Sequence, residues 1–133
     1  MSGELTQQGN TSQRNIDRIC GWLGWHEEER YWLDGQNRTM AHRTARRGSR
    51  VHTFDPFTAP GDCALVLQTL VERGGYFDVV MSASLGALAS VCLQENDPGT
   101  PDHQGRGKTE CEAKMNAFLK AIEDTGWIHA QPA

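Results

Sequence analysis

The sequence predicts an α+β protein: a layered sandwich of a small, mainly antiparallel sheet packed with three amphipathic helices. Three segments carry apolar residues at the 3.6-residue spacing of a helix face, and residues 76–93 alternate around a turn signal as a β-hairpin does. Three amphipathic helices must each bury an apolar stripe, and the sheet is the surface available to them. The layered arrangement follows from that requirement.

The chain has 133 residues, a length that suits one domain. We expect residues 1–13, which are polar and without period, to be a disordered tail. Residues 14–128 should form a single α+β domain, and 129–133 a short C-terminal tail. The polar start lacks the apolar core of a secretory signal, and no apolar run approaches the 18 residues that suggest a membrane span.

The first half of the chain predicts one helix and one short strand. The helix covers about 15–23 and ends at Gly24 in a left-handed cap. Its apolar face consists of Ile16, Ile19, Cys20 and Leu23. Residues 31–33 read as a strand before the turn signal at Asp34 and Gly35. Residues 35–54 have no steady period, so we expect mostly loop.

The second half predicts a helix, the hairpin and a last helix. The middle helix begins near Pro60 and stops at Gly74. Its stripe is Cys63, Val66, Leu67, Leu70 and Val71. Residues 94–108 are rich in Gly, Pro, Asp and Asn and indicate a mobile loop. Thr109 and Glu112 form a capping box for the last helix, which should end at Gly126. Its stripe is Cys111, Met115, Phe118, Leu119 and Ile122.

A concentrated island of positive charge lies between Asp34 and Asp55 on a chain of net charge −4. It holds five arginines, two histidines and no carboxylate, so structural arginines would find no local partner. The planar donor fork of Arg matches phosphate or carboxylate bidentately. The segment therefore predicts an anion site, although a solvated basic loop that offsets the acidity elsewhere has the same composition.

Aromatic residues upstream of the arginines add rings that can stack on a base, the combination used to bind nucleotides. The predicted ligand-binding residues are Arg38, His42, Arg43, Arg46, Arg47, Arg50, Trp25, Tyr31 and Trp32. Trp22 is expected in the core, and Trp25 and Tyr31 at the surface. A long nucleic acid is disfavoured because the isoelectric point is about 5.7.

Other chemistry-bearing residues form no motif of their own. The carboxylates Glu27–Glu29 point in different directions and should be a solvated patch. The histidines lack metal-ligand spacing, and no G-x-S-x-G turn surrounds a serine. We therefore expect no catalytic residue, no metal and no cofactor. The basic, glycine-rich run 105–108 adjoins a helix N-terminus, where phosphate binds readily. The four cysteines should be free thiols, mostly buried.

Three stretches resemble the phage ABA sandwich family of small phage and prophage proteins. They are the Trp-Leu-Gly-Trp element ending at Trp25, the Pro-containing start of the middle helix at 54–62, and the closing order of helix, hairpin, long loop and Ala-rich helix. The resemblance covers roughly residues 15–125. It implies an α/β/α-type sandwich in the cytoplasm of an infected bacterial host. The family has no agreed activity, so it implies no catalytic residues, and the arginine segment is longer and more basic than its usual pattern.

These observations lead to three hypotheses about function. The first is a non-enzymatic phage counter-defence protein that sequesters a small phosphorylated immune signal through the arginine segment. The second is an inhibitor that docks on a host or bacterial defence protein, as anti-CRISPR proteins do. The third is a small nucleotide hydrolase that uses His42 or His52 as acid or base, although no oriented dyad is visible. The sequence is compatible with a homo-oligomer and gives no sign of membrane association.

Overall fold

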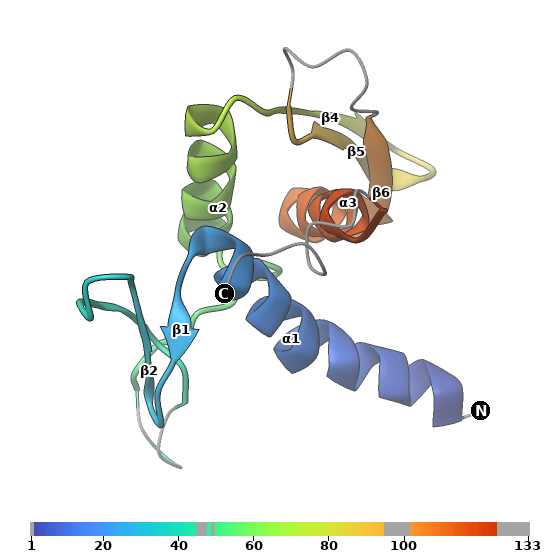
Figure 1. The fold of residues 1–133 in the computed structure, drawn as a ribbon. Helices are drawn as coiled ribbons and strands as arrows, with labels where there is room; N and C mark the ends of the chain where they lie inside the picture. Colours follow the sequence, from blue (N-terminus) through green and yellow to red (C-terminus); the bar gives the residue numbers. More distant parts are fainter. Residues whose placement is uncertain (1, 45–47, 49, 95–101, 125–133) are drawn as a thin grey trace. The chain divides into compact units, whose positions relative to one another are not determined.

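The computed structural model describes residues 2–44, 48, 50–94 and 102–124, with side chains from Gln13 onward. The chain divides into two compact units, Met1–Asp55 and Pro56–Ala133, and each is described by itself. Their described residues form two three-stranded antiparallel sheets and three helices, so the predicted α+β class is confirmed (Figure 1). The expectation of one sheet is wrong. The additional sheet has strands of two to four residues, which are too short to show a period in the sequence.

The first unit consists of α1 (Ser2–Leu23) followed by β1 (His26–Glu27), β2 (Tyr31–Leu33) and β3 (Thr39–His42), paired in the order β1-β2-β3. The helix starts at Ser2, so the predicted start near residue 15 is wrong. No proline interrupts residues 2–14, and once a helix exists each further residue adds one hydrogen bond. The end at Gly24 is confirmed: its φ is 90°, and the following N–H of Trp25 donates to the carbonyl of Cys20 at 2.9 Å.

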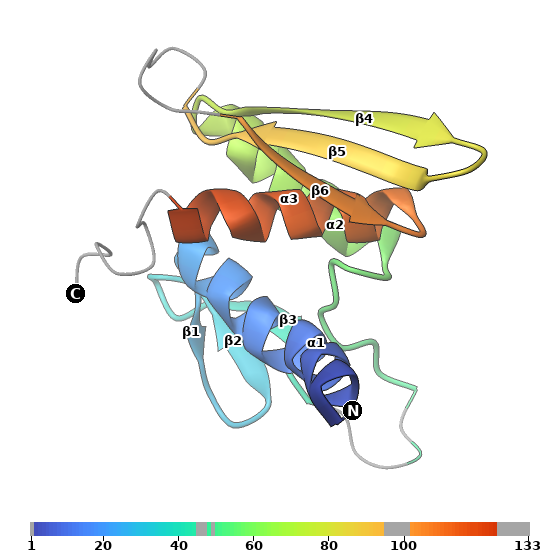
Figure 2. The same cartoon turned by 90° about the vertical axis from the view of Figure 1, so that its right-hand side faces the viewer.

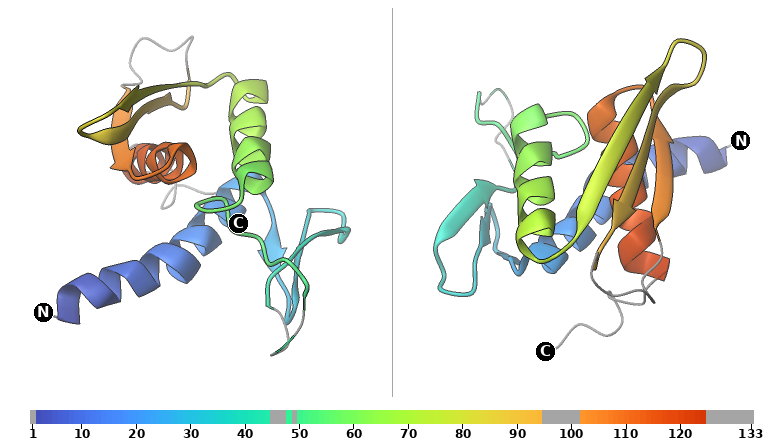
Figure 3. Two further views of the ribbon diagram at one scale, coloured as in Figure 1. Left: turned by 180° about the vertical axis from the view of Figure 1, so that it is seen from behind. Right: turned by 90° about the horizontal axis from the view of Figure 1, so that it is seen from above.

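The second unit consists of α2 (Pro60–Glu72), the hairpin of β4 (Tyr76–Ser82) and β5 (Gly86–Cys92), then β6 (His103–Gly107) and α3 (Glu110–Asp124). Its sheet has the order β4-β5-β6, and the predicted hairpin is confirmed, with Tyr76 opposite Cys92 and Ser82 opposite Gly86. Helix α3 lies across one face of this sheet (Figure 2). Helix α2 contacts β4 and α3 (Figure 3).

Strand β6 corrects the predicted loop at 94–108, of which residues 95–101 lie outside the described residues. Gly105 and Gly107 read as loop residues in the sequence. In the structure they allow the backbone of α3 to approach β6, because a Cβ on Gly107 would lie 2.7 Å from the backbone nitrogen of Ala113. Glycine here serves close packing.

The core of the second unit follows the predicted stripes of α2 and α3. Met115, Phe118 and Ile122 are fully buried, whereas Cys111 is only half-buried. Val71 is 51% exposed, so its assignment to the buried stripe is wrong. The capping box is confirmed, since Thr109 Oγ1 accepts the N–H of Glu112 at 3.2 Å. The Glu112 carboxylate accepts the N–H of Lys108, one residue earlier than the usual pattern. The predicted stop at Gly126 lies outside the described residues.

Candidate functional site

Within the first unit, Arg43 connects the arginine segment to strands β1 and β2. Its Nη2 lies 2.8 Å from Glu27 Oε2, and its guanidinium carbon lies 5.7 Å from the centre of the Trp32 ring. Its backbone N–H donates to the carbonyl of Arg30 at 2.7 Å. Its Nε is buried without a hydrogen-bond partner in the protein. Arg43 thus has a carboxylate partner, contrary to expectation, because β1 brings Glu27 from outside residues 35–54.

Arg38 is also paired within the chain. Its Nε lies 2.8 Å from Asp34 Oδ2, while Asp34 Oδ1 accepts the backbone N–H groups of Gln36 and Arg38 at 2.8 and 2.9 Å. The backbone N–H of Arg38, with further donors from Gln36 and the Arg38 guanidinium, outweighs desolvation and holds the pKa of Asp34 below its ordinary value. Arg38 and Asp34 therefore build the turn between β2 and β3, and they form a structural pair.

The predicted stacking rings differ in exposure. Trp32 is 3% exposed and Trp25 is 8% exposed, so the surface position expected for Trp25 is wrong. The turn after α1 folds Trp25 back toward Cys20, and its ring meets Phe54 edge to face at 5.1 Å between centroids. Trp22 is buried, as predicted. Tyr31 is 39% exposed, also as predicted, and its ring lies 5.1 Å from that of His42, its cross-strand neighbour.

The structure therefore brings Tyr31 together with His42, and Arg43 with Trp32. Arg50 is exposed, and Arg46 and Arg47 lie outside the described residues. The acidic run Glu27–Glu29 is exposed, as expected of a solvated patch. The anion site remains a prediction: among the described residues Tyr31, His42 and Arg50 still support it, Arg38 and Arg43 have carboxylate partners, and Arg46 and Arg47 are not tested.

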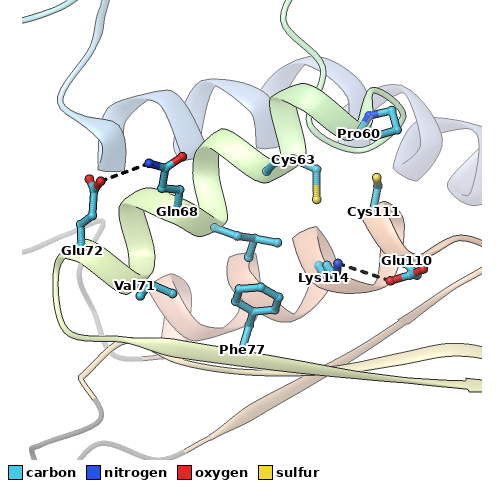
Figure 4. Close-up of a pocket in the computed structure, with 11 residues that line it drawn as sticks. Pro60, Cys63, Gln68, Val71, Glu72, Phe77, Glu110, Cys111 and Lys114 are labelled. Carbon is cyan, nitrogen blue, oxygen red and sulfur yellow. Dashed lines mark hydrogen bonds and ion pairs between the residues drawn. The ribbon is translucent and has the colours of Figure 1, made fainter.

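A cavity of about 630 Å³ lies in the second unit between α2, β4 and the first turns of α3 (Figure 4). It is lined by Pro60, Cys63, Ala64, Leu67, Gln68, Val71, Glu72, Phe77, Glu110, Cys111 and Lys114. Its apolar walls come from α2 on one side and Phe77 of β4 on the other. A cavity this large and this apolar in so small a protein is the strongest candidate for a binding site.

The polar side chains of the cavity are paired with one another. Lys114 Nζ lies 3.4 Å from Glu110 Oε1 and 5.3 Å from the centre of the Phe77 ring. Gln68 Nε2 donates to Glu72 Oε2 at 3.3 Å. The cavity thus presents little uncompensated charge to a ligand, apart from what the Lys114 ammonium offers beyond its carboxylate partner.

Two thiols share one wall of this cavity. Cys63 in the first turns of α2 is 2% exposed, and Cys111 in the first turn of α3 is half-buried. Burial, then the negative charge of Cys111 and a hydrogen bond with it, raises the pKa of Cys63 to about 12. Cys63 is therefore a protonated thiol at neutral pH. All four cysteines are free, as the sequence predicted.

Sequence reasoning missed this cavity because its residues read as core positions. Cys63, Leu67 and Cys111 belong to the predicted apolar stripes. The sequence of one chain does not show whether an apolar helix face packs tightly against its neighbours or leaves a cavity beside them. One signal was available: Cys63 and Cys111 occupy equivalent places, each in the opening turns of a helix. The glycine-rich run 105–108, which was expected in a loop beside a helix N-terminus, belongs largely to β6.

The described part of the chain contains neither a candidate metal site nor a candidate membrane-spanning helix. No three His, Cys, Asp or Glu side chains among the described residues lie close enough together to hold a metal ion. None of the helices in those residues is long and apolar enough to span a bilayer. Comparison of the chain with protein-family models, curated proteins and solved structures found no match.

Proposed function

We propose that this protein works by binding a small, largely apolar molecule in the cavity between α2, β4 and α3. The observation that carries the proposal is the cavity itself, whose volume of about 630 Å³ falls within the roughly 300–1,000 Å³ of ligand pockets. Leu67, Val71 and Phe77 line it with aliphatic and aromatic surface. Removing apolar ligand surface from water at this wall is the driving force, at about 25 cal/mol per Å².

The rim determines the polarity of the ligand. Because Lys114 is paired with Glu110, and Gln68 with Glu72, a strongly charged ligand would have to break an existing pair. A molecule with a flat apolar body and one polar group fits better. The body would lie against Phe77, and the polar group would reach the Lys114 ammonium, which already lies over that ring.

The test uses 1-anilinonaphthalene-8-sulfonate, an apolar fluorophore with one anionic group. We expect saturable fluorescence enhancement and a higher melting temperature, because a ligand that binds only the folded state stabilises it. Ala64→Trp should fill the cavity and weaken binding roughly tenfold or more, which corresponds to about 1.4 kcal/mol. Ala83→Trp, in the exposed turn between β4 and β5, is the matched control and should bind as wild type does.

Equal binding by the wild type and by a folded Ala64→Trp variant would show that the fluorophore binds elsewhere, and the proposal would be wrong. Circular dichroism establishes that both tryptophan variants are folded.

A second candidate is the phage counter-defence protein that sequesters a phosphorylated immune signal. The observation in its favour is the exposed ring of Tyr31 beside His42, in the same segment as the exposed Arg50. Rings that stack on a base and guanidinium groups that hold phosphate suit a nucleotide. Arg38 and Arg43 contribute less than the sequence suggested, because each already holds a carboxylate.

This candidate is tested by titration with ATP and with a cyclic dinucleotide at low and high salt. Binding should weaken as salt rises, since exposed charges are screened over about 8–10 Å near physiological ionic strength. Tyr31→Ala and Arg50→Glu should each weaken it, whereas Arg38→Gln should change it little. Absence of nucleotide binding would favour the alternative in which the segment docks on a host or bacterial defence protein.

A further inference from the structure

The side chains of Cys63 and Cys111 line the same cavity although 47 residues separate them in the sequence. They come from two helices, α2 and α3, that contact one another within the second unit. Figure 4 shows both sulfur atoms beside the same gap between the helices. The two thiols also interact electrostatically, as expected of neighbouring groups in the folded chain.

The two thiols differ in access to solvent. Cys111 is half-buried and lines an open cavity that a small reagent can enter. Cys63 is 2% exposed, and burial raises its pKa, so it keeps its proton at neutral pH. Lys114 lies one helical turn after Cys111 and also lines the cavity. An accessible thiol backed by a buried one is the arrangement of a dithiol that reacts in two steps.

We propose that Cys63 and Cys111 form a redox-active dithiol, which a low-molecular-weight disulfide converts into a disulfide bond between α2 and α3. The proposal goes beyond ligand binding and stands whether or not the cavity takes a ligand. The other cysteines are unsuited to this role: Cys92 is 3% exposed in β5, and Cys20 is fully buried in the first unit.

The reaction balances as two exchanges. The Cys111 thiolate attacks one sulfur of the small disulfide, which forms a mixed disulfide and releases one small thiolate. Cys63 then loses its proton to solvent and attacks the Cys111 sulfur, which forms the Cys63–Cys111 bond and releases the second small thiolate. The two protein thiols lose two electrons and two protons, and the small disulfide is reduced to two thiols by the same amount.

The sequence suits a direct test, because trypsin places each cysteine in a different peptide: 19–30, 51–73, 74–106 and 109–114. Full-length native protein is treated with oxidised glutathione, alkylated, digested without reduction and analysed by mass spectrometry. We expect peptides 51–73 and 109–114 to be joined, and the intact protein to lose two hydrogen atoms. The link should form roughly tenfold or more faster in native protein than in protein unfolded in urea, because folding holds the thiols together.

Variants separate the roles of the two thiols. In the Cys63→Ser variant the reaction should stop at the mixed disulfide between Cys111 and glutathione. In the Cys111→Ser variant Cys63 should not react with glutathione. Cys92→Ser is the matched control and should form the link as the wild type does. Circular dichroism establishes that each variant is folded.

Three results would overturn the proposal. The first is native wild-type protein in which 51–73 and 109–114 stay unlinked under excess oxidised glutathione. The second is a link that forms equally fast in urea. The third is a link that joins either peptide to 74–106 instead.

Discussion

A Cβ placed on Gly105 would lie 2.8 Å from the Cα of Ala117, so β6 and α3 meet backbone to backbone. The next inward-facing position of the strand repeats the relationship, with Gly107 beneath Ala113. The carbonyl of Arg106, between the two glycines, accepts a hydrogen bond from Asn116 Nδ2 at 2.7 Å. The close approach of this helix to the sheet thus depends on two residues without side chains.

Gly105→Ala should therefore destabilise the protein by about 1–3 kcal/mol, the usual cost of overpacking a fixed interior. The atoms it would meet are backbone, which cannot rotate away as a side chain can. Gly61→Ala is the matched control, because nothing lies within 4 Å of a Cβ there and the site is in the first turn of α2. The control should be neutral or stabilising by up to about 1 kcal/mol. Urea unfolding measures both, and equal midpoints would contradict the packing described.

Phe118→Ala should cost about 3–5 kcal/mol, because Phe118 is among the largest fully buried side chains and its removal leaves a cavity. Val71→Ala removes apolar atoms from a side chain that is 51% exposed and should change stability by less than about 0.5 kcal/mol. The free energy of unfolding in urea measures both changes. A loss below about 1 kcal/mol for Phe118→Ala would mean that α3 is not docked on the sheet as described.

The free energy of unfolding should fall as pH rises from 9.0, the ordinary pKa of a cysteine thiol, toward about 12, the pKa of Cys63 in the folded protein. A thiol whose pKa is raised by folding binds its proton more tightly in the folded state, so its contribution is complete below the unfolded pKa. As pH rises through this window the unfolded chain loses the proton first, and that contribution is lost.

Cys63→Ser removes this titration, so the difference in unfolding free energy between wild type and variant should shrink between these pH values. Lys114 and Glu110 also face Cys63 and are present in both proteins. Denaturant unfolding at several pH values decides the matter. A constant difference would show that the thiol titrates normally.

Arg43 and Glu27 should couple weakly, by about 0.2–1 kcal/mol, because the Glu27 side chain is 58% exposed and water screens the pair. A double-mutant cycle with Arg43→Gln and Glu27→Gln measures the coupling free energy. Arg43→Gln alone should cost more than the coupling, since the Arg43 side chain also covers Trp32. Additive single effects would show that the pair contributes no net stability.

The sequence predicted the periodic elements of the second unit well, but it missed residues 2–14 of α1 and most of the short strands. The α2 stripe, the hairpin and the capping box of α3 each have a periodic or local signal that the structure keeps. Strands β1, β3 and β6 have none: the first two hold two and four residues, and β6 holds two glycines that resemble loop residues. A glycine required by close packing and a glycine required by a turn are identical in a single sequence.

The candidate site was less predictable than the fold. Counting arginines located a basic segment, but pairing decides which guanidinium groups stay available, and the partners Glu27 and Asp34 come from neighbouring turns and strands. Exposure of Trp25 and Trp32 likewise depends on tertiary packing. The cavity and its thiols arise from how α2 and α3 meet, which involves residues far apart in the chain.

Only Lys108 and Thr109 stand between β6 and α3, so a strand and a helix that pack along their lengths are neighbours in sequence. Closing so short a connection costs little chain entropy, and contacts local in sequence form quickly. We expect this pair to assemble first in the second unit, with the hairpin adding to it afterwards. A substitution at Gly105 should then slow refolding more than it hastens unfolding, whereas Val79→Ala on the edge strand should do the reverse.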